Sequence, residues 1–296
     1  MPELPDLTLY VDALNERLTD SSLDQVHMTS PFLLRTVAPV VEDFYGRRFE
    51  GCKRLAKQLV LGFEGDFYMV LHLMIAGRLR WSDTHKPPSK RNGLAAFEFS
   101  SGTLLLTEAS KKKRASLRLV QGSKDLAELD PGGLEVLGAD REAFGRRLAS
   151  QNHTLKRALT DQRIFAGIGN AYSDEILLRS GLSPFKQSQH LNQQEVQALY
   201  EASQTVLGEW IERLRRQANG KFPAKVTAFH EEMVAHGKYK APCAFCGAPI
   251  QRIVYAQNEA NYCPRCQTDG RLLADRSLSK LLKDTWPKRL EDLENF

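Results

Sequence analysis

Two pairs of cysteines near the end of the chain have the spacing of a metal site. Cys243 and Cys246 are separated by two residues, as are Cys263 and Cys266, and sixteen residues lie between the pairs. This spacing lets two tight thiolate turns converge on one tetrahedral Zn²⁺. Four cysteine ligands leave no coordination position for water or substrate, so we expect a structural zinc. The fifth cysteine, Cys52, stands alone and is predicted to lie in the core.

The first residues of the chain, Met1-Pro2-Glu3, have the types needed for covalent chemistry on a sugar. If Met1 is removed, Pro2 exposes a secondary α-amine, and a pKa of about 8 leaves part of such an amine neutral near physiological pH. The amine can attack a sugar C1′ carbon and form an iminium, while Glu3 moves protons. Pro2 also suits early processing or a helix entrance, so its type alone does not assign catalysis.

Further along, Gly167-Ile168-Gly169-Asn170 lies between two segments of helical spacing, 155–164 and 171–179. Glycines let backbone N–H groups approach an anion closely, and the positive end of the second helix dipole adds attraction. We therefore expect this turn to bind a phosphate, with Asn170 donating its side-chain amide. An ordinary bend between two helices is the alternative.

The elements that must position these residues follow from hydrophobic spacing. A helix is predicted directly after Pro5, because apolar residues recur every three to four positions: Leu7, Val11, Leu14 and Leu18. From about residue 51 to residue 107, short apolar runs separated by turn residues predict antiparallel β structure, with Lys57 in a strand-like segment. Residues 122–138 are typical of a linker, and helical spacing then dominates through Arg215. A β domain therefore precedes a helical one.

Composition adds broad limits. The chain has 296 residues, 42% of them hydrophobic, which is enough for a real core and for about two domains. The net charge of +5 is compatible with a polyanionic partner and also with an ordinary soluble protein. The amino terminus lacks the basic leader and apolar run of a secretory signal, and no apolar stretch is long enough to span a bilayer. We expect a monomeric cytoplasmic protein without a membrane partner, associated with the nucleoid if bacterial.

Several segments together resemble the formamidopyrimidine-DNA glycosylase and endonuclease VIII family. In chain order they are Pro2-Glu3-Leu4-Pro5, Ala56-Lys57-Gln58-Leu59, His72-Leu73, the run from Gly167 to Leu177, and the finger that ends Tyr262-Cys263-Pro264-Arg265-Cys266-Gln267. The resemblance runs from Pro2 to Gln267, and the joint occurrence of these segments is specific although no single one would suffice.

The resemblance implies an α+β multidomain fold. An N-terminal antiparallel β-sandwich flanked by helices would occupy residues 1–130, a helical helix-two-turn-helix domain 131–240, a four-cysteine zinc finger 241–267 and a C-terminal extension 268–296. The implied function is a bifunctional glycosylase and AP lyase of base excision repair. It would excise oxidised or ring-opened bases from damaged, double-stranded DNA and cleave the strand by β,δ-elimination. A catalytically silent or altered-specificity relative that binds damaged DNA is the alternative.

The resemblance also implies site residues. Pro2 would form the Schiff base, Glu3 would act as acid and base, and Lys57 would contact a phosphate beside the lesion. The DNA-binding residues would be Asn170, Gly167, Gly169, Ile75, Lys113, Arg114 and Asn258.

Four departures from the family pattern concern recognition of the lesion. In the family, wedge side chains fill the space that the flipped-out nucleotide leaves in the duplex, and one of them is the methionine of a His-Leu-Gly-Met segment. That segment reads His72-Leu73-Met74-Ile75 here, so Ile75 stands at the position of the wedge methionine and Met74 at that of the glycine. The usual Asp-Pro-Arg-Arg-Phe loop is replaced by the basic run 111–114 without an aromatic wedge. Asn258 follows Ala-Gln where the family has a phosphate-binding arginine, and Asp6 replaces a glutamate. Arg252 or Lys238 could supply the missing charge. We therefore expect the catalytic residues to be retained and the residues that recognise the lesion to differ from those of the family.

The residues after Gln267 have no counterpart in the family pattern. Apolar residues there are spaced as an amphipathic helix that ends or kinks near Pro287, and these are Leu278, Leu281, Leu282, Trp286 and Leu290. We expect this tail to pack back on the body of the protein rather than to dock a partner.

Overall fold

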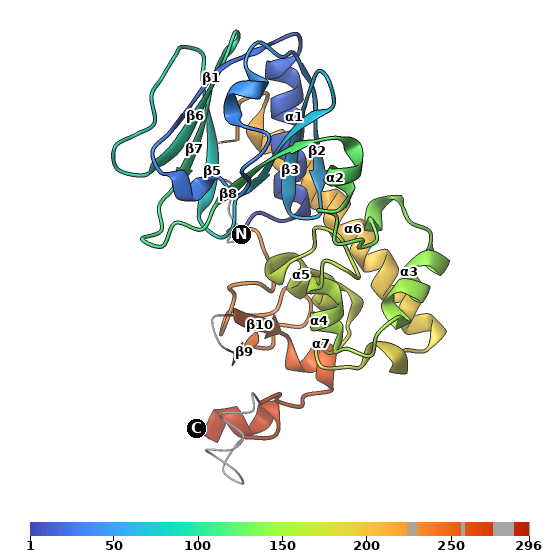
Figure 1. The fold of residues 1–296 in the computed structure, drawn as a ribbon. Coiled ribbons are helices and arrows are strands. Elements are labelled where there is room, and N and C mark those ends of the chain that lie inside the picture. Colours follow the sequence, from blue (N-terminus) through green and yellow to red (C-terminus); the bar gives the residue numbers. More distant parts are fainter. Residues whose placement is uncertain (224–225, 227–229, 256–257, 275–286, 296) are drawn as a thin grey trace. The chain divides into compact units, whose positions relative to one another are not determined.

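The computed structural model describes residues 1–223, 226, 230–255, 258–274 and 287–295. The chain divides into two compact units (Figure 1). Unit 1 comprises residues 1–131 and 210–228, and unit 2 comprises residues 132–209 and 229–296. No helix among the described residues combines the length and apolarity that a membrane span requires.

Unit 1 is an antiparallel β-sandwich with a helix at its start, α1 (Leu4–Leu18). Its strands are β1 (Leu23–Met28), β2 (Phe49–Leu55), β3 (Gln58–Phe63), β4 (Phe67–His72), β5 (Gly77–Ser82), β6 (Gly93–Phe99), β7 (Gly102–Glu108) and β8 (Ser116–Gln121). One sheet has the order β1-β6-β7-β5 and the other β2-β3-β4-β8. A short helix, α2 (Ser123–Ala127), follows the last strand.

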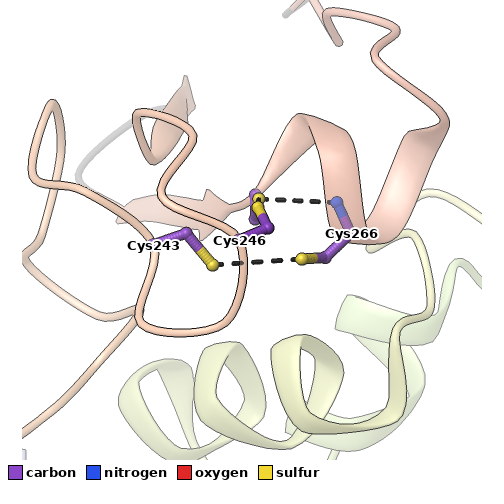
Figure 2. A group of neighbouring side chains, drawn as sticks. Cys243, Cys246 and Cys266 are labelled. Atoms are coloured by element: carbon purple, nitrogen blue, oxygen red, sulfur yellow. Dashed lines mark hydrogen bonds between the residues drawn. The ribbon is translucent and has the colours of Figure 1, made fainter.

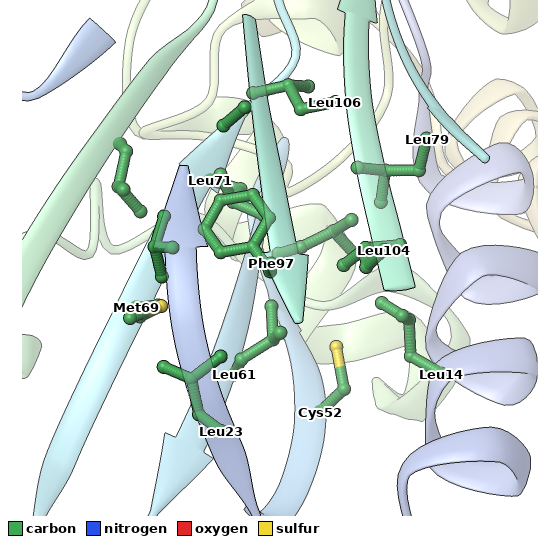
Figure 3. Close-up of a cluster of buried hydrophobic side chains, with 14 of the residues drawn as sticks. Leu14, Leu23, Cys52, Leu61, Met69, Leu71, Leu79, Phe97, Leu104 and Leu106 are labelled. Atoms are coloured by element: carbon green, nitrogen blue, oxygen red, sulfur yellow. The ribbon is translucent and has the colours of Figure 1, made fainter. Parts of the chain in front are cut away.

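The core of unit 1 lies between the two sheets and α1. Alternate residues of each strand point inward, as the period of two requires, and Figure 3 shows Leu61 and Met69 of one sheet near Phe97 and Leu104 of the other. Cys52 belongs to this cluster, as predicted. Burial raises the pKa of its thiol to about 12, so this sulfur is an unreactive core group.

Three expectations about the first 138 residues need correction. The β structure begins at β1 and ends at β8, well outside residues 51–107. The first strand, β1, was missed because it is polar and half-exposed and so gives little hydrophobic signal. Residues 122–138 contain α2 and a 3₁₀ turn, Val136–Gly138, rather than a plain linker. Lys57 lies in the turn between β2 and β3 and not in a strand, since Ala56 takes a positive φ of 51° that ends the pairing.

Unit 2 is helical with a small hairpin near the end of the chain. Its elements are α3 (Arg141–Ala149), α4 (Leu155–Thr160), α5 (Asn170–Ser180), most of α6 (Gln193–Ala218), β9 (Gln251–Tyr255), β10 (Asn258–Tyr262) and α7 (Pro264–Thr268). The helix expected over 155–164 is shorter than predicted, because α4 ends at Thr160 and the chain turns at Asp161. Gly181 ends α5 in the left-handed conformation that suits glycine.

The predicted tail helix lies largely outside the described residues, which resume at Pro287. The described part folds back on the start of the tail: Leu272 donates its N–H to Lys288 O at 2.9 Å, and Leu290 donates to Gly270 O at 2.8 Å. Leu290 packs against the apolar cluster around the cysteines. This part of the tail therefore covers the finger of its own unit.

Candidate nucleic-acid interface and metal centre

Strand register gathers several predicted site residues at one end of the sandwich in unit 1. Leu59, just after the turn that carries Lys57, pairs with Leu71, and the next residue, His72, pairs with Ser116. The chain then needs only the four residues 73–76 to reach Gly77, which pairs with Glu108 at the end of β7. The turn 56–57 and the connections 73–76 and 109–115 therefore lie at the same end.

The amino terminus reaches this same end of the sandwich. Pro2 is buried, Glu3 is 2% exposed and Lys57 is 8% exposed. Burial lowers the pKa of the Met1 α-amine; the positive charges of Arg78 and Lys57 act in the same direction, and Glu3 opposes them. The structure thus brings Pro2, Glu3 and Lys57 together, as the sequence predicted, although their roles remain predictions.

Two further ionisable groups lie nearby. Asp6, in the first turn of α1, accepts the Glu3 backbone N–H at 2.8 Å, and burial raises the pKa of its carboxyl to about 7. Burial and the charges of Lys57 and Arg118 lower the pKa of His72. The His72 Nδ1 atom accepts the N–H of Met74 at 3.0 Å, so a neutral imidazole holds the start of the next connection.

That connection, residues 73–76, exposes the predicted wedge. Ile75 is 56% exposed, whereas Leu73 is buried. Met74 has a φ of 52°, in the left-handed region that favours glycine. Gly77 donates its N–H to Leu73 O at 2.9 Å and closes the turn. An apolar side chain therefore stands at the tip of a tight turn, while its insertion into DNA remains a prediction.

The basic run 111–114 is a loop anchored on one buried carboxylate. Glu108 is 1% exposed, and its side chain accepts the N–H groups of Arg114 and Ala115 at 2.9 and 3.1 Å. The Lys113 ammonium donates to the backbone carbonyl of Glu108. Sequence reasoning placed Lys113 and Arg114 on DNA but missed Glu108, whose position at the end of an apolar strand was the available signal.

In unit 2 the glycine turn is held by its own neighbours. Gly167 has a φ of 81° and donates its N–H to Gln162 Oε1 at 2.8 Å, so this group already has a partner within the chain. Gly169 is the N-cap residue of α5. Asn170 donates its side-chain amide to Glu259 O at 2.8 Å. Because an amide nitrogen carries two hydrogens, Asn170 can still donate to a phosphate.

A buried polar cluster lies behind this turn, and sequence reasoning missed it. Lys156 donates to Asn170 O at 2.6 Å and to Asp174 Oδ1 at 2.5 Å. The other oxygen of Asp174 lies 2.8 Å from His236 Nδ1. Beside it, Glu175 accepts three backbone N–H groups of residues 234–236. These contacts fasten α4 and α5 to the segment that leads into the finger.

The four cysteines of unit 2 converge as predicted. Figure 2 shows Cys243, Cys246 and Cys266 facing one another. Cys243 Sγ lies 4.0 Å from Cys266 Sγ, Cys246 Sγ lies 3.4 Å from Cys263 Sγ, and all four sulfurs are within 4.8 Å of one another. Tetrahedral zinc with Zn–S bonds of about 2.3 Å requires sulfurs about 3.8 Å apart. The set therefore fits one zinc ion.

Next to the cysteines, the β9–β10 hairpin carries Asn258 as the first residue of β10. Arg252 on β9 lies over the Tyr239 ring, 4.4 Å from its centroid, and 3.6 Å from the Glu259 carboxylate. This arginine is partly exposed and is one cation of the hairpin that could face a phosphate.

Three family models match this chain. They are described as the formamidopyrimidine-DNA glycosylase N-terminal domain (residues 1–114), the formamidopyrimidine-DNA glycosylase H2TH domain (135–219) and a zinc finger found in FPG and IleRS (241–268). The formamidopyrimidine-DNA glycosylase of Desulfitobacterium hafniense DCB-2 is 31% identical over 283 residues, which cover 90% of this chain and all of the relative. The chain belongs to the formamidopyrimidine-DNA glycosylase family.

Solved structures agree with this membership. MutM (FPG) of Thermus thermophilus is 30% identical, with a TM-score of 0.76 over 90% of this chain and 98% of that one. Lactococcus lactis FPG, in a complex with DNA that contains FAPY-dG, is 25% identical, with a TM-score of 0.79 over 90% of this chain and all of that one. The α+β fold, the helical H2TH region and the zinc finger predicted from the sequence are confirmed.

Within the formamidopyrimidine-DNA glycosylase family, the four-cysteine cluster is a structural zinc site, as predicted. Cys243 and Cys263 are buried, and Leu290 of the tail packs beside them. With every coordination position taken by sulfur, the metal holds the hairpin and α7 together and offers no position for a substrate.

Proposed function

We propose that this chain is a bifunctional DNA glycosylase and AP lyase that removes oxidised or ring-opened bases from double-stranded DNA. One observation carries the proposal most: Pro2 and Glu3 are buried at the end of the sandwich, where the charges of Arg78 and Lys57 act on the chain terminus. A solvated chain terminus has no need of such surroundings, whereas a nucleophilic amine does.

The chemistry begins with removal of Met1, which leaves the secondary amine of Pro2 in this environment. The proline nitrogen attacks C1′ of the damaged nucleotide, the bond from C1′ to the base breaks, and the base leaves with a proton. Opening of the sugar ring then gives an iminium between Pro2 and C1′. Loss of a C2′ proton expels the 3′ phosphate, and a second elimination expels the 5′ phosphate.

The neighbouring groups suit these steps. Burial lowers the pKa of the Met1 amine, and we expect the same surroundings to act on the Pro2 amine once Met1 is removed. An amine with a lowered pKa is neutral in a larger fraction at pH 7, which favours attack. Glu3 lies next to Pro2 in the chain and is buried with it, so its carboxyl can deliver and remove protons at the opened sugar. Lys57 supplies a positive charge for a phosphate beside the lesion.

Each unit by itself offers phosphate contacts for DNA. In unit 2 they come from the second amide hydrogen of Asn170, because Gln162 already accepts the Gly167 N–H, and in unit 1 from Lys113 and Arg114. The relatives whose solved structures contain lesion DNA support damaged DNA as the substrate. Because phosphate contacts carry no sequence information, they suit a protein that must act anywhere on DNA.

Borohydride trapping tests the proposal directly. The protein, shown by mass spectrometry to lack Met1, is incubated with a duplex that contains an abasic site. A covalent adduct is expected with the unaltered protein and with Pro5→Ala, which changes a nearby proline in the first turn of α1 but keeps the amine. Pro2→Gly is expected to abolish the adduct.

Glu3→Gln separates the two halves of the reaction. Release of a damaged base needs a proton that the amide cannot supply, whereas an abasic aldehyde has no base to release. We therefore expect Glu3→Gln to lose excision of an intact lesion but to retain an adduct with abasic DNA. If the Met-free, unaltered protein gives no adduct on any lesion yet binds damaged duplexes, the chain is instead a silent damage-binding relative.

A further inference from the structure

The connection between β5 and β6 in unit 1 does not take the short route between its strands. β5 ends at Ser82, which pairs with Thr103, whereas β6 begins at Gly93, which pairs with Thr107. Residues 83–92 therefore run back along the sheet, and they arrive at the end where Gly77 pairs with Glu108. This is the end that also carries the 73–76 and 109–115 connections.

The last part of this connection is a fixed turn. Gly93 donates its N–H to Ser89 O at 2.9 Å, and Glu108 donates its N–H to Asn92 O at 2.8 Å. A Cβ atom at Gly93 would lie 2.5 Å from Ser89 N and 2.6 Å from Ser89 O, so only glycine permits this approach. The backbone that carries Lys90 and Arg91 is thus held against the end of β7.

Charge then accumulates around Glu108. Lys90 and Arg91 are exposed on one side of its strand end, and the basic run 111–114 follows on the other. Within the part of the chain that the structure describes, no salt bridge is found for Lys90 or Arg91. The backbone turns hold these positive charges close together, so the charges repel one another. The negative phosphates of a nucleic-acid backbone would offset this repulsion.

We propose that Lys90 and Arg91 bind the sugar-phosphate backbone of the DNA duplex and extend the contact made by the basic run 111–114. The inference rests on the proposed function, because it assigns these residues to the same DNA substrate. Both side chains act as phosphate contacts, so they contribute affinity and salt dependence and no preference for a base or a lesion.

The test is the salt dependence of duplex binding, measured by fluorescence anisotropy between about 50 and 200 mM salt. Each phosphate contact adds about 0.9 to the slope of log K against log salt, so Lys90→Gln/Arg91→Gln is expected to reduce the slope by about 1.8. The reduction should be equal for an undamaged duplex and for one with a stable abasic analogue. Arg48→Gln/Lys124→Gln removes the same charge at the other end of the sheets and should leave the slope unchanged.

The outcomes separate this inference from the proposed function. An unchanged slope in the Lys90 and Arg91 variant, or an equal loss in the control, overturns the inference even if the protein forms the borohydride adduct. A reduced slope in a protein that binds duplexes without forming an adduct supports the inference while the proposed chemistry fails. A wild-type protein that binds no duplex overturns both.

Discussion

Replacing Asp6 by asparagine is expected to stabilise unit 1, and to do so only above acidic pH. Asp6 is 2% exposed, and burial raises the pKa of its carboxyl from 3.8 to about 7. The folded state therefore holds a proton that the unfolded state has lost, and this group's stabilising contribution falls as pH rises from about 4 to about 7. Asparagine has the same shape, can accept the Glu3 N–H through its carbonyl oxygen, and does not titrate.

The magnitude follows from the shift. Three pKa units at about 1.4 kcal/mol each give roughly 4 kcal/mol, so the variant should exceed the unaltered protein in free energy of unfolding by up to that amount at pH 8. Near pH 4 the two proteins should differ little, because Asp6 is then protonated in both states.

Urea unfolding followed by tryptophan fluorescence measures this difference. Trp81 and Trp210 both lie in unit 1, and a Trp286→Phe background removes the third tryptophan. Asp24→Asn, at an exposed position on β1, is the matched control and should change the unfolding free energy by less than about 0.5 kcal/mol. A stability gain from Asp6→Asn that is the same at pH 4.5 and pH 8 would refute the reasoning, since a buried charge would then not be its source.

Three other predictions concern unit 2. Cys263→Ser should release the zinc, measured as metal content per chain, and should weaken duplex binding; a variant that keeps one equivalent contradicts the four-sulfur site. Asn170→Ala should weaken binding of damaged and undamaged duplexes alike by about tenfold, and a loss confined to one of them would show base readout. Glu175→Ala leaves three backbone N–H groups of residues 234–236 without their acceptor, so unfolding in urea should show a loss of at least about 3 kcal/mol, with a smaller loss for Glu175→Gln.

The parts that could be predicted from the sequence depend on local spacing. The four cysteines lie in two short motifs, and the helix after Pro5 follows from apolar residues within fifteen positions. Membership of the family depended on segments whose order and spacing can be read directly. In each case the constraint, either the spacing of metal ligands or the helical period of apolar residues, acts between residues that are close in the sequence.

The parts that could not be predicted depend on which partner each polar group takes. Gln162 occupies the Gly167 N–H that a phosphate was expected to approach, and nothing in the local motif distinguishes that amide from others. Glu259 holds Asn170 across 89 positions, and His236 meets Asp174 across 62. Such partners are set by the packing of elements, which hydrophobic periodicity does not specify.

The wedge connection shows how chemistry and recognition can change separately. A methionine at φ 52° costs about 1 to 2 kcal/mol relative to glycine, and such strain persists only where the surroundings hold the backbone in place. Here the His72 imidazole, the buried Leu73 and the N–H of Gly77 do so. The backbone of the turn is therefore held in place with Met74 where the family pattern has glycine, and the side chain at its tip is the branched, shorter Ile75 where the pattern has methionine. The side chain predicted to fill a vacated base position is thus isoleucine, whereas the predicted catalytic residues Glu3 and Lys57 match the family pattern, so the lesion preference can diverge from that of relatives without loss of the proposed chemistry.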